Sequence, residues 1–504
     1  MSQVARNISI IGSGPSGLYT AYHLVKKANT IKVPINIKIW EKNPVPFGLS
    51  RYGVAPDHPE VKNCEDTFTT MFREYEELSA GFCKSLQFIG NTIVGQPSMS
   101  SATNPFENHV ALKSLMQTED VVVLSYGCNG DRRLNIPHEE ECSSVFTSRQ
   151  FVNWYNGQFD VALSDKFMKF DWSKVRKVGI IGNGNVALDV ARLLISNQVK
   201  ELWGVSDIST VALEQLNKAP IESVKIIGRR DFSHSKFTNK EYRELWELEK
   251  YGIFGNIIST EFDTLVKDIK APSNDRVMMR RLEMSKEYLL PFDQRSKKNY
   301  KKVRPPIERA ESKKHWEFDY LLSPVGINMH PGTKDLKSVT FAQNVMQKDG
   351  SLVQSDSTVT TDFDLLITSL GYKGEPLEEF GELGIQFDRS HVKNIDGRVL
   401  SNSDVPIPGL YTSGWINNGG QGVIANTMQG AFQVADRILE DMAAKPIHKK
   451  STSNAELNTQ LPNQTTWADW EEINKKELQK GKAQGKNRSK YITVDSVMNV
   501  LKTN

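Results

Sequence analysis

The chain reads "NISIIGSGPSGLYTAYHL" at residues 7–24 and "KVGIIGNGNVALDVARLL" at residues 177–194. Each stretch is a short apolar run, a glycine turn and a run with apolar residues at helical spacing. A strand, a tight turn and a helix in this order form the pyrophosphate site of a dinucleotide-binding fold. The sequence therefore predicts an α/β protein with two dinucleotide-binding (Rossmann-like) domains.

The first turn has the full G-x-G-x-x-G pattern, with Gly12, Gly14 and Gly17. The first glycine permits the tight turn, the second lets the backbone approach a pyrophosphate, and the third lets the helix pack against the strand. The next expected strand, at residues 35–41, ends in Glu41, whose carboxylate can accept hydrogen bonds from both ribose hydroxyls of an adenosine. The first site thus suits FAD, and the alternative is a glycine-rich turn without a nucleotide.

The second turn has the related pattern G-x-G-x-x-A. It consists of Gly182, Asn183, Gly184, Asn185, Val186 and Ala187. The strand expected at 223–228 is followed by Arg229 and Arg230 instead of an acid. Two guanidinium groups can bind a 2′-phosphate that a carboxylate would repel. The second site therefore suits NADPH, and the alternative is a solvated arginine pair at a strand end.

A glycine-rich turn and a long amphipathic helix follow in the last third of the chain, at residues 419–442. The N–H groups and dipole at the start of this helix, near Gly422, Val423 and Ile424, could stabilise the anionic reduced ring of a flavin. The alternative is a packing helix with a glycine-rich cap. Strand-like runs at 364–372 and 409–415 precede it.

The order of these motifs predicts that the NADP domain is inserted into the FAD domain. We expect an FAD-binding domain at 1–130 and 372–504, the latter with a C-terminal extension, and an NADP-binding domain at 131–371. The stretch at 199–222 interrupts the second fold, which predicts a surface excursion. Residues 445–465 are polar and poor in aromatics, which predicts a linker or exposed loop.

Composition limits the function classes. The chain has 504 residues, 38% of them hydrophobic, and a formal net charge of +3, so its total charge does not indicate nucleic acid. No apolar run is long enough for a transmembrane segment. The first expected strand starts at Asn7, so we expect no targeting segment in the given sequence, and the sequence pattern does not indicate a destination. The four cysteines, at 64, 83, 128 and 142, form no CxxC pair. This argues for a reducing compartment, against a cysteine-ligated zinc or iron–sulfur site and against a thiol-disulfide flavoenzyme, and we expect no metal site.

Longer motifs carry a specific resemblance. They are "EKNPVPFGLSRYGVAPDHPEVKN", "SYGCNGDRRLNIP", "GRRDFSHSKFTNKEYREL", "SLGYKG", "SGWINNGGQGVIA" and "WADWEEINKKELQKGKAQGKNRSK", besides the two glycine turns. With them the chain resembles, nearly end to end, the adrenodoxin reductase family of mitochondrial NADPH:ferredoxin reductases. The resemblance implies an FAD enzyme that accepts hydride from NADPH onto flavin N5 and passes single electrons to a 2Fe–2S ferredoxin. It also implies a mitochondrial matrix location, with peripheral inner-membrane association, and a role in iron–sulfur cluster and haem A biosynthesis or in P450 systems.

The resemblance also implies cofactor contacts at matching positions. Those for FAD are Ser16, Glu41, Leu49, Val94, Trp415, Gly422, Val423 and Ile424, beside the glycines of the first turn. Those for NADP are Asn183, Gly184, Asn185, Val186, Arg229, Arg230, Glu241 and Gly422. Gly422 is shared because the nicotinamide must stack on the flavin.

Two further residues are candidates for a proton route. In the family, the positions of His58 and Asp189 approach each other, and reduction of a flavin adds a proton overall. The alternative is that His58 packs in a loop and Asp189 is an acid on a helix face. Hydride transfer between stacked rings needs no nucleophile.

A basic segment at 276–304 contains ten Lys or Arg residues and three acids. Arg276 and Arg280 are one helical turn apart, with Arg281 beside them. In the family a basic helix here docks an acidic ferredoxin, and a basic face would steer such a partner. The alternative is a solvated face.

Two other functions stay open from the sequence. A glutamate-synthase-like NADPH flavoprotein subunit shares the paired nucleotide folds, although that class usually carries cysteine clusters. A nucleotide-binding sensor would keep both sites without turnover. Bleaching of a yellow protein by NADPH would exclude the sensor.

Overall fold

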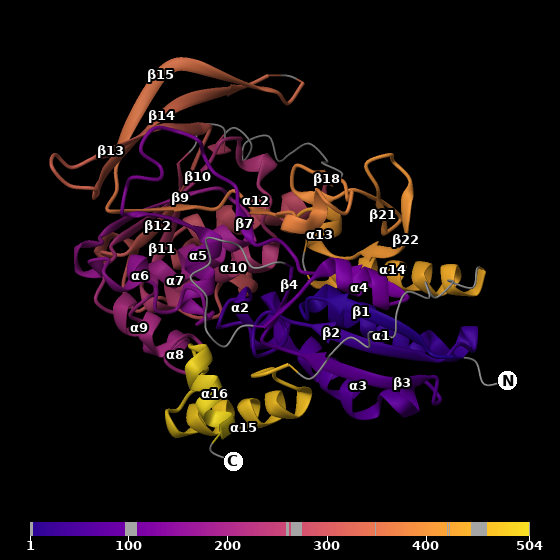
Figure 1. Cartoon of the computed structure of the whole chain (residues 1–504). Helices are drawn as coiled ribbons and strands as arrows, with labels where there is room; N and C mark the ends of the chain where they lie inside the picture. The colour runs from indigo at the N-terminus through magenta and orange to yellow at the C-terminus, as the bar shows by residue number, and fades with distance from the viewer. Residues whose placement is uncertain are drawn as a thin grey trace. The chain divides into compact units, whose positions relative to one another are not determined.

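The chain is described here by a computed structural model that covers residues 4–95, 108–258, 262–263, 275–347, 349–420, 422, 424–444 and 461–502. It divides into two compact units (Figure 1). Unit 1 comprises Met1–Asp131 and Gly371–Asn504, and unit 2 comprises Arg132–Leu370. The predicted insertion of one domain into the other is confirmed.

Unit 1 is built on a seven-stranded sheet with the order β20-β21-β22-β6-β1-β2-β3. Its strands are β1 (Arg6–Ile11), β2 (Ile35–Trp40), β3 (Cys83–Ile89), β6 (Val121–Leu124), β20 (Asn394–Ile395), β21 (Arg398–Leu400) and β22 (Pro406–Thr412). The five strands from β22 to β3 are parallel, and β20 and β21 extend the sheet in antiparallel pairing. Strand β22, from the last third of the chain, pairs directly with β6.

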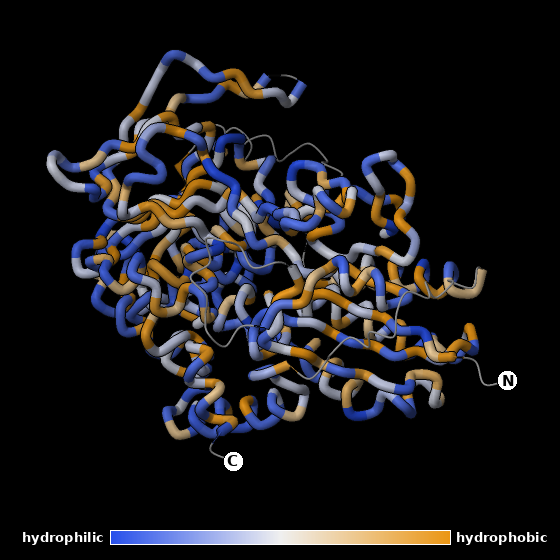
Figure 2. The backbone as a smooth tube through the Cα atoms, viewed as in Figure 1, coloured by the Kyte–Doolittle hydropathy of each residue, from blue (hydrophilic) through white to orange (hydrophobic). Residues whose placement is uncertain are grey.

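Both faces of this sheet are covered, as expected for parallel strands. In β1, Ile8 and Ile10 are fully buried, and Ile11 on the other face joins a core cluster with Leu112 and Leu115 of α4 (Leu112–Thr118). Helix α1 (Pro15–Ile31) packs against α3 (Cys64–Leu78) and α14 (Ile424–Ala444). Figure 2 shows orange, hydrophobic stretches alternating with hydrophilic residues in this part of the chain.

Unit 2 contains a six-stranded, fully parallel sheet with the order β11-β12-β10-β9-β16-β8. Its strands are β8 (Val145–Thr147), β9 (Lys177–Ile181), β10 (Ser223–Gly228), β11 (Phe254–Ile258), β12 (His315–Tyr320) and β16 (Leu365–Thr368). A three-stranded antiparallel sheet stands beside it. Its strands are β13 (Leu322–Met329), β14 (Leu336–Met346) and β15 (Leu352–Asp362).

The alternation of side chains along the parallel strands separates two cores in unit 2. Val178 and Ile180 of β9 belong to a large cluster with the buried faces of α5 (Ser148–Tyr155), α7 (Asn185–Ile195) and α10 (Asn239–Trp246). Ile181 points to the other face and joins a smaller cluster with Val339 and Phe341 of β14. Helices therefore cover one face of the sheet, and the antiparallel sheet covers the other.

The stretch at 199–222 is not the surface excursion that the sequence predicts. It forms α8 (Lys200–Trp203) and α9 (Thr210–Leu216), and Trp203, Ala212 and Leu216 are buried in the large core cluster. The indole N–H of Trp203 donates to the carbonyl of Ser196 at 3.0 Å. The prediction rested on the spacing between motifs, which shows that the stretch interrupts the second fold. The apolar side chains of the stretch nevertheless make it part of the core of unit 2.

The remaining elements connect these layers. The helices are α2 (Leu49–Tyr52), α6 (Asp165–Met168), α12 (Arg276–Leu289), α13 (Trp415–Asn418), α15 (Trp467–Ala483) and α16 (Val494–Lys502), and the short strands are β4 (Thr92–Val94), β5 (Asn108–Val110), β7 (Gly130–Asp131), β17 (Tyr372–Lys373), β18 (Phe387–Asp388) and β19 (His391–Val392). Within the described part of the chain, no helix has the length and apolarity that a bilayer crossing needs. All four cysteines are buried free thiols.

Of the predicted linker at 445–465, residues 445–460 lie outside the described residues. The remainder is not an exposed loop throughout, because Thr465 is fully buried and its backbone pairs with Gly90. The polar composition of the stretch hid this contact.

Candidate nucleotide-binding sites

The three glycines of the first turn meet three different spatial demands. Gly12 has φ +102°, and a Cβ atom there would lie 2.6 Å from the carbonyl oxygen of Ser125. A Cβ at Gly17 would lie 2.0 Å from the carbonyl oxygen of Gly12, so only glycine lets α1 pack this close to the turn. A Cβ at Gly14 would have no described heavy atom within 4 Å. Space is therefore open beside the backbone of Gly14.

The N-terminus of α1 adjoins this space. Gly14 is its N-cap, Pro15 follows, and neither a described side-chain cap nor an acid occupies the first turn. The first N–H groups of a helix have no partner within the helix, and they carry the positive end of its dipole. This end of α1 can accept an anion such as a pyrophosphate.

Glu41 follows β2 and is held in place by four hydrogen bonds. Its Oε2 accepts from the backbone N–H of Ser13 at 3.0 Å and from the Ser13 hydroxyl at 2.7 Å. Its Oε1 accepts from the backbone N–H and the side-chain amide of Asn43, both at 3.0 Å. The two backbone N–H groups fix the carboxylate, while the hydroxyl and the amide can rotate away in favour of ribose hydroxyls.

Two further segments of unit 1 lie against the first turn. The N–H of Phe47 donates to the carbonyl of Ser13 at 3.0 Å, and a Cβ at Gly48 would lie 3.1 Å from Cα of Gly14. From the last third of the chain, a Cβ at Gly414 would lie 2.4 Å from Cβ of Ser16. Residues 12–17, 47–49 and 413–415 therefore converge within one unit.

The other residues expected to contact FAD lie in different local environments. Leu49 opens α2 and Trp415 opens α13, where its ring is 5.0 Å from that of Tyr372. Val94 ends β4, and its side chain is buried in the core.

The glycine-rich approach to α14 is described only in part. Gly422 has φ +90°, and Ile424 is the first residue of α14. Val423 lies outside the described residues.

The second turn repeats the geometry of the first within unit 2. Gly182 has φ +117°, and its Cβ would lie 2.2 Å from the carbonyl oxygen of Ser369. Gly184 is the N-cap of α7, without a described side-chain cap, and its Cβ would meet no described atom within 4 Å. Ala187 is fully buried against the sheet. The N-terminus of α7 can therefore accept a second pyrophosphate.

The asparagines of this turn tie it to the segment 235–238. The side-chain amide of Asn183 donates to the hydroxyl of Ser235 at 3.3 Å, and Oδ1 of Asn185 accepts from the N–H of Thr238 at 2.7 Å. Val186 packs on the large core cluster. The residues of the second turn are thus held in place both by α7 and by hydrogen bonds to the segment 235–238.

Arg229 and Arg230 directly follow β10, as predicted. Arg229 is exposed, and its carbonyl accepts from the side-chain amide of Asn344 on β14 at 2.8 Å. Nε of Arg230 is buried and has no hydrogen-bond partner among the described residues. A Cβ at Gly228 would lie 2.9 Å from Nδ2 of Asn183, so this strand end adjoins the turn. The arginines and the second turn are brought together.

Glu241 lies in the first turn of α10, two residues after the N-terminal residue of that helix. Its Oε2 is buried and accepts no hydrogen bond from the described part of the chain. An unused buried acceptor fits a hydroxyl-bearing ligand.

His58 and Asp189 lie in different units. His58 is 7% exposed and is the N-cap of the 3₁₀ turn Pro59–Lys62. Asp189 lies on α7 and forms an ion pair with Arg192 at 2.9 Å. A proton route through the two residues stays a prediction.

The basic segment requires one correction. Arg276 and Arg280 are exposed on α12, but Arg281 is 4% exposed and faces the core of unit 2. Its guanidinium donates to the carbonyls of Ser235 and Phe237 at 3.2 and 2.7 Å, and it lies over the ring of Phe237. Arg281 is thus wrong as a docking residue, because an i+5 position turns away from the face of position i.

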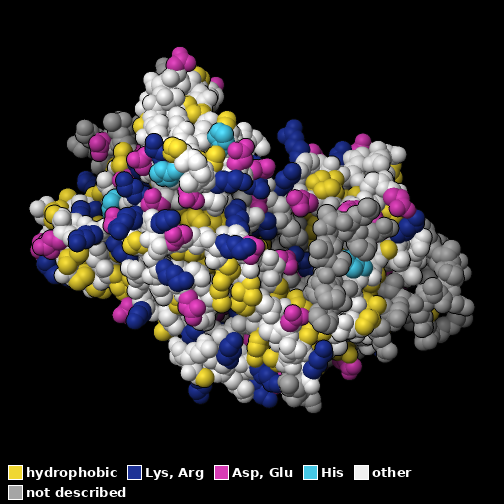
Figure 3. All heavy atoms as spheres, turned by 60° about the vertical axis from the view of Figure 1, so that its left-hand side comes forward, with side chains coloured by type: hydrophobic (Ala, Val, Ile, Leu, Met, Phe, Trp, Pro, Cys, Tyr) yellow, Lys and Arg dark blue, Asp and Glu magenta, His cyan; other side chains and the backbone are white. Residues whose placement is uncertain are grey.

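Arg295 is buried as well, in a two-pronged ion pair with Glu249. The exposed cations of the segment are Arg276, Arg280, Lys286, Lys297, Lys298, Lys301, Lys302 and Arg304. Figure 3 shows that Lys and Arg side chains are interspersed with Asp and Glu on the face that it draws.

Sequence reasoning missed the residues that hold these sites in place. Asn43 and Ser13 orient Glu41, and Asn344 fixes the backbone at Arg229. Ser13 and Asn43 adjoin the motif residues, so proximity could have indicated them. Asn344 comes from a strand 115 residues away, and no local pattern marks it.

Comparisons with known proteins agree with this arrangement. Residues 10–86 match the NAD(P)-binding Rossmann-like domain family. The chain is 52% identical to the probable mitochondrial NADPH:adrenodoxin oxidoreductase of Saccharomyces cerevisiae, over 99% of this chain and 97% of that protein. It is 31% identical to the mitochondrial NADPH:adrenodoxin oxidoreductase of Bos taurus, over 98% and 92%. Among solved structures, Mycobacterium tuberculosis FprA in complex with NADPH is similar, with a TM-score of 0.78 and 27% identity over 99% of both chains.

Proposed function

Because the chain belongs to the NADPH:adrenodoxin oxidoreductase family, we propose that it is a mitochondrial FAD enzyme that oxidises NADPH and reduces a 2Fe–2S ferredoxin. The observation that carries the assignment is the different ending of two similar sites. A glutamate follows the strand beside the first turn, and two arginines follow the strand beside the second. One chain then holds two different dinucleotides.

The first site holds FAD. The α1 N-terminus binds the pyrophosphate, Gly14 leaves room for it, and Glu41 accepts hydrogen bonds from the adenosine ribose. Ser16, Leu49, Val94, Trp415 and the start of α14, with Gly422, Val423 and Ile424, complete the contacts. The open space beside Gly14 and the uncapped helix fit this group.

The second site holds NADPH. The turn from Asn183 to Val186 and the α7 N-terminus bind the pyrophosphate, and Arg229 and Arg230 bind the 2′-phosphate through charge-assisted hydrogen bonds. Two buried polar atoms have no hydrogen-bond partner among the described residues: Nε of Arg230, which can donate to a ligand, and Oε2 of Glu241, which can accept from one. Gly422 is shared between the two cofactors.

When FAD is bound, it supplies the conversion of a two-electron hydride donor into two one-electron transfers. The chain itself binds and orients the two cofactors, and it supplies no nucleophile to the reaction. His58 and Asp189 move a proton in this proposal, with Arg192 orienting the carboxylate of Asp189 at 2.9 Å.

An acidic ferredoxin docks on the exposed cations of the basic segment. Arg276 and Arg280 share one face of α12, and Lys286 and Lys298 are exposed on the same segment. Cations that face the solvent steer an acidic partner and set its orientation. Peripheral association with the inner membrane is part of the same proposal, tested by co-sedimentation with cardiolipin-containing vesicles.

Anaerobic titration tests the function directly. The purified protein should be yellow, and about one equivalent of NADPH should bleach its flavin absorbance, as the two-electron balance of hydride transfer requires. Addition of an oxidised 2Fe–2S ferredoxin should then restore the flavin spectrum and produce the electron paramagnetic resonance signal of the reduced cluster. Retention of both nucleotides without bleaching would instead favour the sensor.

A further inference from the structure

The C-terminal segment, residues 461–491, packs on the proline-rich segment, residues 43–53. Trp467 of α15 stacks on Phe72 of the adjacent helix α3, with ring centroids 3.8 Å apart. Its neighbour on the helix, Trp470, meets Phe47 edge to face at 5.3 Å, and Trp467 meets the same ring at 6.0 Å. Both tryptophans thus hold Phe47 from the side of α15.

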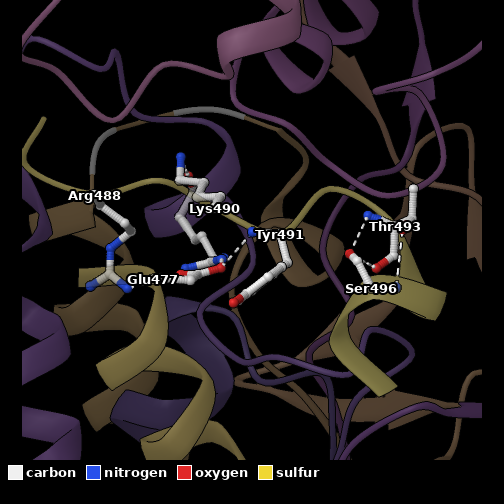
Figure 4. A network of polar contacts seen from close by, with 7 residues as sticks. Glu477, Arg488, Lys490, Tyr491, Thr493 and Ser496 are labelled. Carbon is white, nitrogen blue, oxygen red and sulfur yellow. Dashed lines mark hydrogen bonds and ion pairs between the residues drawn. The ribbon is translucent and has the colours of Figure 1, made fainter. Parts of the chain in front are cut away.

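A buried ion pair joins the same two segments. Glu477 of α15 is fully buried, and its Oε1 accepts from Nη2 of Arg51 at 2.6 Å. Its Oε2 accepts from Nη1 of Arg488 at 2.9 Å, and its Oε1 also accepts from the backbone N–H of Tyr491 at 2.9 Å (Figure 4). The ammonium of Lys490 donates to the carbonyl of Arg51 at 3.2 Å. Breaking a pair of this kind leaves an uncompensated buried charge.

A third anchor lies just before α15. The backbone of Thr465 pairs with Gly90 in both directions, at 2.8 and 3.2 Å. Its hydroxyl donates to the carbonyl of Pro44 at 2.7 Å. The start of the proline-rich segment is therefore anchored as well as Arg51 near its end.

Between these anchors the proline-rich segment has an unfavourable backbone conformation. Phe47 has φ +87°, which a bulky side chain rarely adopts, and the next residue, Gly48, has φ +47°, which glycine tolerates. A bulky residue in this region persists only where its surroundings impose the conformation. Phe47 and Gly48 are also the residues that contact Ser13 and Gly14 of the first turn. The strained residue Phe47 and its neighbour Gly48 therefore lie next to the turn that is assigned to the pyrophosphate.

We propose that the C-terminal segment is a clamp that holds the proline-rich segment over the first dinucleotide, with Glu477 as its principal positioning residue. This inference rests on the proposed function, because it takes the ligand of the first turn to be FAD. The clamp slows the release of FAD: the segment must move away from Gly14 before the pyrophosphate can leave. Glu477 touches neither cofactor and acts through Arg51 and Phe47.

The test measures the rate at which FAD leaves the holoenzyme, followed as the rise of flavin fluorescence after dilution. Glu477→Gln should accelerate the release by at least about tenfold, which corresponds to about 1.4 kcal/mol. The matched control is Glu249→Gln in unit 2, where Glu249 is 5% exposed and pairs with Arg295. This control also breaks a buried Arg–Glu pair, and it should release FAD at the wild-type rate.

Thr465→Val is the second variant, in case Glu477→Gln does not fold. It keeps the side-chain shape, removes the bond to Pro44, and should accelerate release by about threefold, for the loss of roughly one neutral hydrogen bond. The clamp is refuted if the folded variants release FAD within twofold of wild type, or if Glu249→Gln accelerates it equally. Wild-type protein that purifies without FAD would overturn the proposed function itself.

Discussion

The removal of Arg229 and Arg230 tests the distinction between the two nucleotide sites. The 2′-phosphate is the chemical difference between NADPH and NADH, and it lies far from the ring that gives up hydride. We therefore expect Arg229→Ala with Arg230→Ala to weaken the use of NADPH and to leave that of NADH within about threefold, since no contact to NADH is removed.

The structure sets the size of the effect. A hydrogen bond to a charged group contributes about 1.5 to 3 kcal/mol. Arg229 is exposed, so solvent and salt screen its contact toward the lower value, about tenfold in binding. Nε of Arg230 is buried and unpartnered among the described residues, which favours the upper value, about 150-fold. Neighbouring residues are not additive, so we expect a loss of about 100- to 1000-fold for the pair.

The assay is kcat/KM for both nucleotides, with ferricyanide as acceptor so that ferredoxin docking does not enter. The control is Arg176→Ala, which removes an exposed arginine just before β9. Because β9 and β10 are parallel neighbours, Arg176 lies at the opposite end of the strands from Arg229 and Arg230. It should leave the ratio of NADPH to NADH use unchanged. If the double variant keeps that ratio within twofold of wild type, the assignment of the second site to NADPH is wrong.

Four further predictions follow from the geometry. The cofactor released by denaturation should have the mass of FAD, because FMN has no adenosine for Glu41; the FMN mass would refute the first site. Gly17→Ala should abolish flavin binding or folding, since its Cβ would lie 2.0 Å from a carbonyl oxygen, and normal flavin content would contradict this packing. Arg276→Glu with Arg280→Glu should raise the KM for ferredoxin and flatten its salt dependence, with ferricyanide reduction unchanged; equal loss in both assays would indicate a role in folding. Burial raises the pKa of the Glu477 carboxyl, but the neighbouring Arg51 and Arg488 together lower it by more, so that the net pKa lies below its usual value. The ionised carboxylate therefore contributes to stability above about pH 4.5, and this contribution is lost on further acidification. Glu477→Gln should reduce the fall in the free energy of unfolding at acid pH, measured by urea denaturation, and an unchanged pH dependence would contradict the pairing.

Much of the fold could be predicted because its signals are local. The glycines of both turns, the apolar strand before each and the helix after each lie within 18 residues. The two Rossmann-like folds, the insertion and the family resemblance are confirmed. The endings at Glu41 and Arg229 were legible for the same reason, because each directly follows a strand.

What the sequence did not indicate depends on contacts between distant segments. Arg281 has the composition of a docking residue, but the packing of α12 on Phe237 buries it. Trp203 was hidden in a stretch without a motif, although its burial makes the stretch part of a core. In the sequence Glu477 is one of several charges of both signs on a helix, and only the fold reveals Arg51 opposite it.

The pairing of β22 with β6 has a consequence for how the protein is made. Strand β6 ends at Leu124, and β22 begins at Pro406, after the whole of unit 2 has been synthesised. Unit 2 is continuous in sequence and can fold as soon as its last strand leaves the ribosome. Until β22 arrives, β6 is an open edge of a hydrophobic sheet, the kind of edge that recruits strands from other chains. The first part of the protein to be translated is thus the last to be completed, and the nascent chain depends on protection of that edge for most of its synthesis.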